Sequence, residues 1–432
     1  MPLAEFLSNN ISPAIQTLSN THPSLGFRGL AFATCLFTWL LIGVGGIVTS
    51  QGVGMSVPDW PNTYGYNMFY FPFSQWIGGI FWEHSHRLMA SLVGLMTLIL
   101  TIWAHGRSGR SLLRYGILPL SIVLTLLVLI NAKNNTLQHA SITGGIGIIA
   151  LFASFLWPRM NPASKLTRRL CWIALLMVIG QGLLGGLRVT LYKDEIGIIH
   201  ATLAQLFLVL LVSITFVSSK RWTVWRAASK DHQAVANRFS WIMCALCVLV
   251  VCQLILGAFM RHEHAGLAVT GFPLAYDQYL WPPTHAEFVN QLNVDRMDHR
   301  DFNPITALHV QVHMLHRSMA LILFIAASFF VGWSLKYLGR QHLLGRLSIL
   351  WFSLLCLQAF LGVATVWSNK AADIATTHVL IGALTLALGS FMVVAARRSV
   401  FLAKESKEAK ATRHREMPDD LIQSPEVAVA KG

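Results

Sequence analysis

Charged side chains are scarce in this sequence. Only 12% of its 432 residues are Asp, Glu, Lys or Arg, whereas a soluble domain carries roughly 25%. Hydrophobic residues make up 54% of the chain, and several apolar runs exceed the roughly 20 residues that a helix needs to cross a bilayer. These runs are long and uniform, which excludes a β-barrel built from short alternating strands. The sequence therefore predicts an all-α polytopic membrane protein.

Cysteine is missing from the polar loops. All six cysteines lie inside apolar runs, so we expect no structural disulfide: Cys35, Cys171, Cys244, Cys247, Cys252 and Cys356. Cys244 and Cys247 have the spacing of a redox motif, but they fall within one predicted helix and lack the strand–helix context of redox domains. We interpret this pair as ordinary helix packing.

Acidic residues are also few, and the net charge is +14. The basic residues cluster in short loops after every second apolar run, which is an orientation signal rather than a nucleic-acid surface. They place these loops and both termini in the cytoplasm, with segments 50–77 and 261–304 outside. The alternation fits ten spans and would also fit eight, whereas nine would break it. The ten spans are predicted at about residues 29–49, 78–104, 112–131, 139–157, 169–189, 196–218, 239–260, 305–335, 343–367 and 373–396.

An internal repeat organises these spans. The segment from Trp82 to Arg87 aligns with the segment from Val312 to Arg317, because each ends in His-Arg. Gln-x-x-x-Gly recurs at Gln181 and Gln358, 19 residues before His200 and 20 before His378. Such self-similarity indicates a duplicated architecture.

The two halves differ in length. His86 and His200 are 114 residues apart, whereas His316 and His378 are 62 apart, an excess of 52 residues. That excess suits two short spans and a connection. We therefore predict two four-helix halves with a helical hairpin inserted in the first.

The predicted organisation has five parts. They are a cytoplasmic N-terminal segment 1–28, a first bundle 29–218 with the hairpin at about 108–160, a cytoplasmic linker 219–238, a second bundle 239–397 with the outer loop 261–304, and a charged cytoplasmic tail 398–432 without regular structure.

The four repeated histidines are the strongest candidates for a site: His86, His200, His316 and His378. Ionisable side chains inside a bilayer are costly and mark function by default. Two histidines from different helices can ligate a haem iron from both faces. Zinc or copper would need three or four ligands, and here the ligands come in twos. A hydrogen-bonded core histidine is the alternative for each position.

Glu83 lies three residues before His86 and four before Arg87, so the three share one helix face. Either they form a salt-bridge cluster at the membrane surface, or the carboxyl takes part in chemistry. His313 occupies the position of Glu83 in the second half. The aromatic and proline-rich segment that begins at Val57 is either an interfacial aromatic belt or a lid over the first site.

These motifs resemble the haem A synthase family of cytochrome oxidase assembly. The resemblance is carried by Glu83-x-x-His86-Arg87, by Gln181 to Val189 with His200, by His316-Arg317 and by His378. It implies two four-helix bundles related by pseudo-twofold symmetry. The first would hold the substrate haem O between His86 and His200.

The resemblance further implies a prosthetic haem b between His316 and His378. Such an enzyme oxidises a methyl group of haem O to a formyl group through hydroxylated intermediates, giving haem A for cytochrome oxidase. Glu83 matches the family's proposed catalytic carboxylate. Arg87 and Arg317 would bind haem propionates or pair with carboxylates. The first outer loop lacks the cysteine pair of some bacterial members, which argues against a thiol relay there.

The expected surroundings follow from the same resemblance. The chain would be a multi-pass protein of the bacterial cytoplasmic (inner) membrane, with haem O, haem A and the lipid bilayer as partners and no nucleic acid. A haem O synthase, a membrane electron acceptor and a second copy of the chain are further candidate partners. The first alternative function is a diheme b-type membrane electron-transfer cytochrome, which explains the paired histidines but needs no Glu83. The second is a non-enzymatic transporter with internal repeats, which would require helices broken at mid-membrane.

Overall fold

The computed structural model describes residues 23–131, 136–158, 160–223, 225, 230–295 and 304–416. Within them lie ten helices that are long and apolar enough to cross a membrane. The strands that these residues contain form one short hairpin of β1 (Asn62–Thr63) and β2 (Tyr66–Asn67). The all-α polytopic fold predicted from the sequence is confirmed.

The helices fall into two sets of four and one inserted set. The first half has α2 (Leu25–Ser50), α3 (Gly78–Ala104), α7 (Lys165–Leu191) and α8 (Asp194–Val217). The second half has α10 (Lys230–His262), α12 (Ala307–Leu338), α13 (Leu343–Trp367) and α14 (Ala372–Glu416). The inserted hairpin has η3 (Gly106–Ser108), α4 (Gly109–Leu112), η4 (Leu113–Ile117), α5 (Leu118–Ile130) and α6 (Thr136–Leu156).

Short elements lie outside the spans. On the side of the outer loops they are η1 (Met68–Tyr70), η2 (Phe73–Gln75) and α11 (Ala286–Val294), and α9 (Lys220–Thr223) lies between the halves. Side-chain caps fix where several spans begin. Ser24 accepts a hydrogen bond from the N–H of Phe27 at the start of α2, and Thr306 accepts one from His309 at the start of α12. Such caps satisfy amides that the helix itself leaves unpaired.

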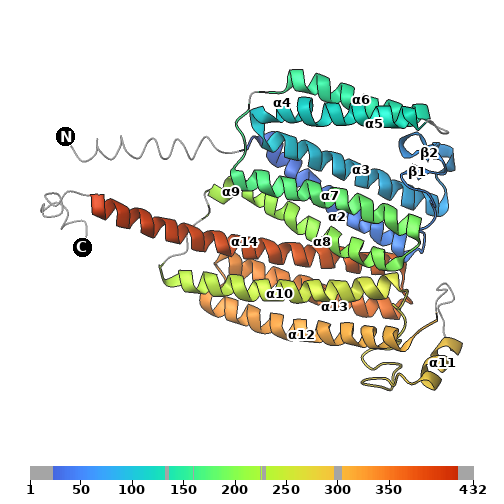
Figure 1. The fold of residues 1–432 in the computed structure, drawn as a ribbon. Helices are drawn as coiled ribbons and strands as arrows, with labels where there is room; N and C mark the ends of the chain where they lie inside the picture. Colours follow the sequence, from blue (N-terminus) through green and yellow to red (C-terminus); the bar gives the residue numbers. More distant parts are fainter. Residues whose placement is uncertain are drawn as a thin grey trace, which may run out of the picture.

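Each half is a closed ring of four helices with the same neighbours (Figure 1). In the first ring α2 packs on α3, α3 on α7, α7 on α8 and α8 on α2. In the second ring α10 packs on α12, α12 on α13, α13 on α14 and α14 on α10. The equivalences are therefore α2 with α10, α3 with α12, α7 with α13 and α8 with α14. The hairpin α5–α6 lies along the outside of the first ring, where Ile102 of α3 packs with Leu113 and Ala150.

The two rings meet along α2 and α8 on one side and α10 and α14 on the other. Glycines allow the close approach of α2 and α14. A Cβ at Gly46 would lie 2.9 Å from Cγ2 of Thr376, and a Cβ at Gly43 would lie 3.1 Å from Cδ2 of Leu380. The indole Nε1 of Trp39 donates to the carbonyl of Leu380 at 3.1 Å. Small residues at crossings are how membrane helices pack without a hydrophobic driving force.

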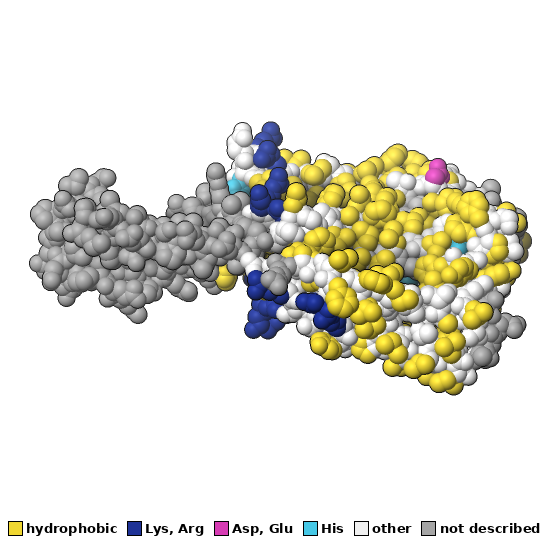
Figure 2. All heavy atoms as spheres, turned by 90° about the horizontal axis from the view of Figure 1, so that it is seen from above, with side chains coloured by type: hydrophobic (Ala, Val, Ile, Leu, Met, Phe, Trp, Pro, Cys, Tyr) yellow, Lys and Arg dark blue, Asp and Glu magenta, His cyan; other side chains and the backbone are white. Residues whose placement is uncertain are grey.

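Charge and hydrophobicity are distributed as in a membrane protein. Figure 2 shows Lys and Arg side chains gathered at one end of the molecule, with a largely hydrophobic surface over the neighbouring part of that face. At that end Arg398 lies over the ring of Trp222, 4.5 Å from its centroid, and Arg397 lies 4.2 Å from the ring of Trp241. Basic residues next to aromatic rings are typical of a membrane–water boundary.

Two predicted boundaries need comment. The tail was expected to lack regular structure after residue 398, but α14 continues to Glu416. This part of the sequence is rich in Ala, Lys, Glu and Arg, which are strong helix formers and allow the helix to extend past its apolar section. Residues 1–22 of the predicted N-terminal segment and 417–432 of the predicted tail lie outside the described residues.

The close crossing of α2 and α14 makes a prediction about stability. Gly46→Ala places a methyl group against the stiff Thr376 side chain, so we expect a loss of about 1–3 kcal/mol in the free energy of unfolding. Gly94→Ala is the matched control, because a Cβ there meets nothing within 4 Å. Thermal unfolding in detergent should show a lower Tm for Gly46→Ala and an equal or higher Tm for Gly94→Ala. Equal Tm shifts would contradict the close packing of the rings.

Candidate functional site

Each of the four repeated histidines faces a glycine on the next helix of its own ring. A Cβ at Gly185 would lie 3.4 Å from Cε1 of His200, and the corresponding distance from Gly257 to His316 is 3.2 Å. The other two pairs are Gly45 with His86, at 3.0 Å from Nε2, and Gly362 with His378, at 3.2 Å from Cε1. The absence of a side chain on the facing helix leaves room for the ring. This glycine–histidine unit therefore occurs four times.

A glutamine accompanies three of these units. Nε2 of Gln181 donates to the carbonyl of His200 at 3.1 Å, and Nε2 of Gln253 donates to the carbonyl of His316 at 3.0 Å. In each case the glutamine stands four residues before the glycine, so one helix face supplies both the donor and the space. The amide ties the backbone of the histidine helix at the residue that carries the ring.

The ring nitrogens of these three histidines are held beside the glutamine helix. Nδ1 of His200, His316 and His378 is buried, and each ring lies against the backbone of its glutamine. His86 differs, because its Nε2 faces Gly45. Leu41 stands where the other units have glutamine, so this unit lacks the amide side chain.

The rings come together in the predicted pairs. His86 and His200 are close enough to interact electrostatically, and so are His316 and His378. All four are only partly buried, whereas the neighbouring His84, which makes no such pair, is fully buried. Partial exposure deep in a helical ring means that open space lies beside the imidazoles. Paired imidazoles with space between them suit a flat macrocycle whose iron takes a nitrogen ligand on each face.

Val57 in the first outer loop binds α3 through both of its backbone groups. Its N–H donates to Oε2 of Glu83 at 2.9 Å, and its carbonyl accepts from Nη2 of Arg87 at 2.7 Å. Val57 and Glu83 are both buried. The arginine of the His-Arg motif and the preceding glutamate therefore bind the backbone of the loop from one helix face.

The second outer loop is fastened in the same way through Val269. Its N–H donates to Nδ1 of His313 at 3.3 Å, and its carbonyl accepts from Nη2 of Arg317 at 2.9 Å. His313 thus takes the place of Glu83 in the contact as well as in the sequence. The repeat extends from the helices into the outer loops.

A tyrosine closes each loop seven residues further on. The hydroxyl of Tyr64 donates to the carbonyl of Ser56 at 2.5 Å, and the hydroxyl of Tyr276 donates to the carbonyl of Ala268. Burial raises the pKa of the Tyr276 phenol, an effect that the charge of Arg317 partly opposes. The phenol therefore stays protonated and remains a donor at neutral pH.

An aromatic residue from each loop reaches its own ring of helices. Trp60 lies directly over Gly186, the residue after the glycine that faces His200. Phe272 contacts Trp367 at the outer end of α13, with ring centroids 6.4 Å apart. Of the two interpretations of the first outer loop, these contacts favour a lid over the site.

Arg87 is fully used by protein acceptors. Nη1 donates to the carbonyls of Asp59 (2.7 Å) and Asn62 (3.0 Å), and Nη2 donates to the carbonyl of Val57 and to Oε1 of Glu83 (2.6 Å). All four terminal N–H groups are therefore occupied. Of the two roles that the resemblance allowed, pairing with a carboxylate is the one seen, and no terminal donor remains for a propionate.

Comparison with known proteins gives the same assignment as the geometry. A family model described as cytochrome oxidase assembly protein matches residues 139–389, more than half of the chain. The chain belongs to the haem A synthase family of cytochrome oxidase assembly proteins. The matched part contains three of the four histidines and ends within α14.

Individual members of the haem A synthase family match over long stretches. The heme A synthase of Shouchella clausii is 23% identical over 380 residues, covering 86% of this chain and 98% of the relative. Those of Bacillus cereus and Alkalihalophilus pseudofirmus are 24% and 23% identical over 62% and 60% of this chain, and over 79% and 78% of their own lengths. The relatives place this family member among multi-pass bacterial membrane proteins.

Three further residues of this family member lie near the sites and were not singled out from the sequence: Arg188, Arg261 and His262. Arg188 is close to both His86 and His200. Arg261 and His262 end α10, in the second half, yet both contact the first half. A basic residue one turn beyond the glycine of a Gln-x-x-x-Gly motif was the available signal for Arg188 and Arg261.

Two other histidines of the described residues, His309 and His139, have local roles. His309 lies in the cap of α12, with its Nε2 3.9 Å from Oε2 of Glu263. His139 contacts Nδ2 of Asn67 at 3.0 Å, which joins the hairpin to the first outer loop. Within the described residues no cluster of three or more His, Cys, Asp or Glu side chains could hold a metal ion.

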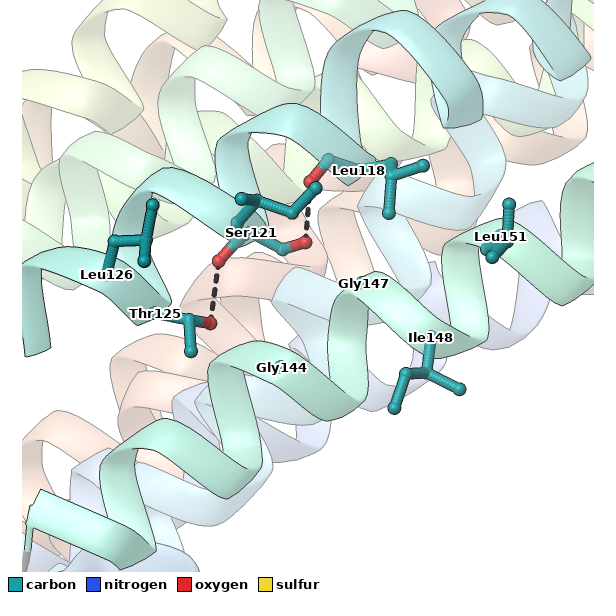
Figure 3. A pocket seen from close by; sticks show the side chains of 9 residues that line it. Leu118, Ser121, Thr125, Leu126, Gly144, Gly147, Ile148 and Leu151 are labelled. Carbon is teal, nitrogen blue, oxygen red and sulfur yellow. Dashed lines mark hydrogen bonds between the residues drawn. The ribbon is translucent and has the colours of Figure 1, made fainter. Parts of the chain in front are cut away.

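A groove of about 230 Å³ lies between α5 and α6, away from the histidines (Figure 3). Gly144 and Gly147 on α6 face Ser121 and Thr125 on α5. The hydroxyls are satisfied within their own helix, since Ser121 donates to Leu118 at 2.7 Å and Thr125 donates to Ser121 at 2.8 Å. The groove is otherwise apolar and offers no group for chemistry.

The fastening of the outer loops can be tested by amide hydrogen exchange. Arg87→Gln removes most of the donors that hold residues 57–62, so exchange in that loop should become faster by roughly ten- to a hundredfold. Arg317→Gln should do the same for residues 268–276. Each variant is the control for the other, because only its own loop should respond. Unchanged exchange at residues 57–64 in Arg87→Gln would disprove the fastening role.

Proposed function

We propose that this chain is a haem A synthase that oxidises a methyl group of haem O to a formyl group through hydroxylated intermediates. The observation that carries the proposal is the pair of matched sites, in which two histidines from opposite helices each face a glycine. In this proposal haem O lies between His86 and His200, and a prosthetic haem b lies between His316 and His378.

The residues at both sites fit a haem. The four imidazoles form two facing pairs with space beside the rings, and neutral imidazole nitrogen is a common axial ligand of haem iron. The glycines clear the helix face next to each ring, where a larger side chain would compete with a macrocycle. When bound in the second half, haem b would supply the redox capacity to take up electrons released by the oxidation.

Glu83 is the residue we assign to proton transfer. In the proposed reaction the formyl oxygen comes from water and the oxidation releases protons together with electrons, so a proton acceptor near the substrate is needed. The carboxylate is buried and its Oε1 and Oε2 already accept from Arg87 and Val57. These bonds fix its position, and each oxygen keeps a further lone pair for a water or a proton.

The second half has no equivalent carboxylate. His313 stands in place of Glu83 and uses its Nδ1 for the loop. This difference supports assigning the oxidation to the first half and electron transfer to the second. A membrane electron acceptor would then dock near the second half, and a haem O synthase would deliver substrate to the first. We also propose that the basic end of the molecule faces the cytoplasm, as the distribution of Lys and Arg favours.

The test of this function is the haem content of the purified full-length protein after expression with a haem O synthase. Chromatography with mass spectrometry should find haem B together with haem O, hydroxylated haem and haem A. His316→Ala and His378→Ala should lose haem B, whereas His86→Ala and His200→Ala should lose the haem O series. His105→Ala is the control, because His105 lies at the opposite end of α3 from His86.

Haem B alone in the wild-type protein, despite available haem O, would instead support the diheme electron-transfer cytochrome. Unchanged haem B in both second-half variants would remove the assignment of His316 and His378.

A second prediction separates the chemical and structural roles of Glu83. Glu83→Gln keeps an oxygen acceptor for Val57 but loses the carboxylate charge and its basicity. We expect haem binding and loop exchange close to the wild type, with conversion lowered by roughly 10²- to 10⁴-fold. Glu83→Ala should in addition release the loop. Normal production of haem A by Glu83→Gln would limit this residue to holding Val57.

A further inference from the structure

Two nitrogen atoms that have no hydrogen-bond partner among the described residues meet at the outer end of the first site. They are Nε of Arg188, on α7, and Nδ1 of His262, at the end of α10, and both are buried. A Cβ at Gly197 would lie 2.5 Å from Nδ1 of His262 and 3.1 Å from Nε of Arg188. Both nitrogens therefore border the same glycine of α8, one turn from His200.

Arg188 lies near the paired histidines of the first half. It stands three residues after Gly185, which faces His200, and it is close enough to interact with His86, His200 and His262. Gly54 in the outer loop leaves room for its guanidinium, since a Cβ there would lie 2.9 Å from Nη1. Two glycines on different segments thus leave room for one arginine side chain.

The acceptors that surround Arg188 leave its donors largely open. Its ion pair with Asp194 is long, at 3.6 Å from Nη2 to Oδ1, and the carboxylate is 39% exposed. By contrast, Arg87 has all four terminal N–H groups occupied. Arg188 is therefore the guanidinium at the first site that has capacity for an additional anion. A buried donor left without an acceptor destabilises the protein, which favours a ligand at this position.

The second half lacks this arrangement. Thr365 stands three residues after Gly362, where the first half has Arg188, and its hydroxyl donates to its own helix at Leu361. Ala375 stands three residues before His378, where the first half has Gly197. An arginine at this position of the Gln-x-x-x-Gly helix is thus present in the first half, whereas the second half has Thr365 there.

We infer that Arg188 and His262 bind a carboxylate side chain of the porphyrin substrate and so position it in the first site. The inference rests on the proposed function, which places the substrate between His86 and His200. A haem carries two propionates, and a guanidinium with an imidazole N–H is a suitable donor set for a carboxylate. Since His262 comes from the second half, the substrate site is complete only when both halves are present.

The experiment compares binding of haem O with binding of its dimethyl ester, in which both carboxylates are neutral. The probe is titrated into full-length protein that retains its second-half haem, and the Kd is read from the Soret band. Wild-type protein should bind the free acid at least about tenfold more tightly than the ester. Arg188→Gln and His262→Gln should each weaken binding of the free acid by roughly ten- to a hundredfold, with little effect on binding of the ester.

Matched variants separate a direct contact from a general change in charge. Lys193→Gln removes a positive charge from the exposed residue that precedes α8, and it should leave the ratio of the two Kd values unchanged. Gly197→Ala inserts a methyl group against His262 and Arg188, so it should lower the ratio as the direct variants do. Arg188→Lys should retain part of the preference, because the charge remains but the planar donor set is lost.

This binding experiment can fail separately from the test of the proposed function. The inference is overturned if the two Kd values of the wild-type protein are nearly equal, or if Arg188→Gln weakens binding of acid and ester equally. Either result would leave conversion of haem O intact. If wild-type protein takes up no haem O in the first half, the proposed function fails. The inference is supported if the preference for free haem O over its ester disappears only in the Arg188, His262 and Gly197 variants.

Discussion

An imidazole inside a membrane protein needs space for its ring and a polar environment for its nitrogens, because lipid supplies neither. The glycine–histidine unit supplies the space, because a glycine faces each ring, and at His200 and His316 a glutamine one turn from that glycine donates to the carbonyl of the histidine. The unit fixes the distance between neighbouring helices and their relative register. The remainder of each ring follows, since α7 can approach α8 this closely only where Gly185 meets His200.

Duplication has preserved this unit and the fastening of the outer loops while the chemistry around them has diverged. Val57 and Val269 are held through the same backbone atoms, but one binds a carboxylate and the other an imidazole. Exchange of Glu83 for His313 keeps the loop in place and removes a basic oxygen. Two sites with similar architecture can thus have different tasks. A substrate site must release its ligand and a prosthetic site must retain it, so divergence in the loops and anchors is physically reasonable.

Most of the fold and the pairing of the histidines could be predicted from the sequence, because hydropathy, basic loops and the His-Arg repeat are local signals. The repeat in the outer loops was missed, since it depends on backbone contacts to Val57 and Val269 in segments that share few side chains. The length of α14 was also misjudged, because charge was given more weight than helix propensity. His262 could not be assigned from the sequence, since it reaches the first site only when α10 packs on α8.

Adjacent residues at the end of α10 show why the two halves act as one molecule. Arg261 donates to the carbonyl of Gly46 and, at 2.5 Å, to Oγ of Ser50 on α2, while it also lies near His378. His262, the next residue, borders the first site. A single helical turn therefore contacts both sites and the interface between the rings. Independent rings would leave this arginine without its acceptors, and a buried charge without acceptors is costly. The polar contacts at this turn consequently favour one fixed arrangement of the halves, and a fixed arrangement is what electron transfer between two haems would require.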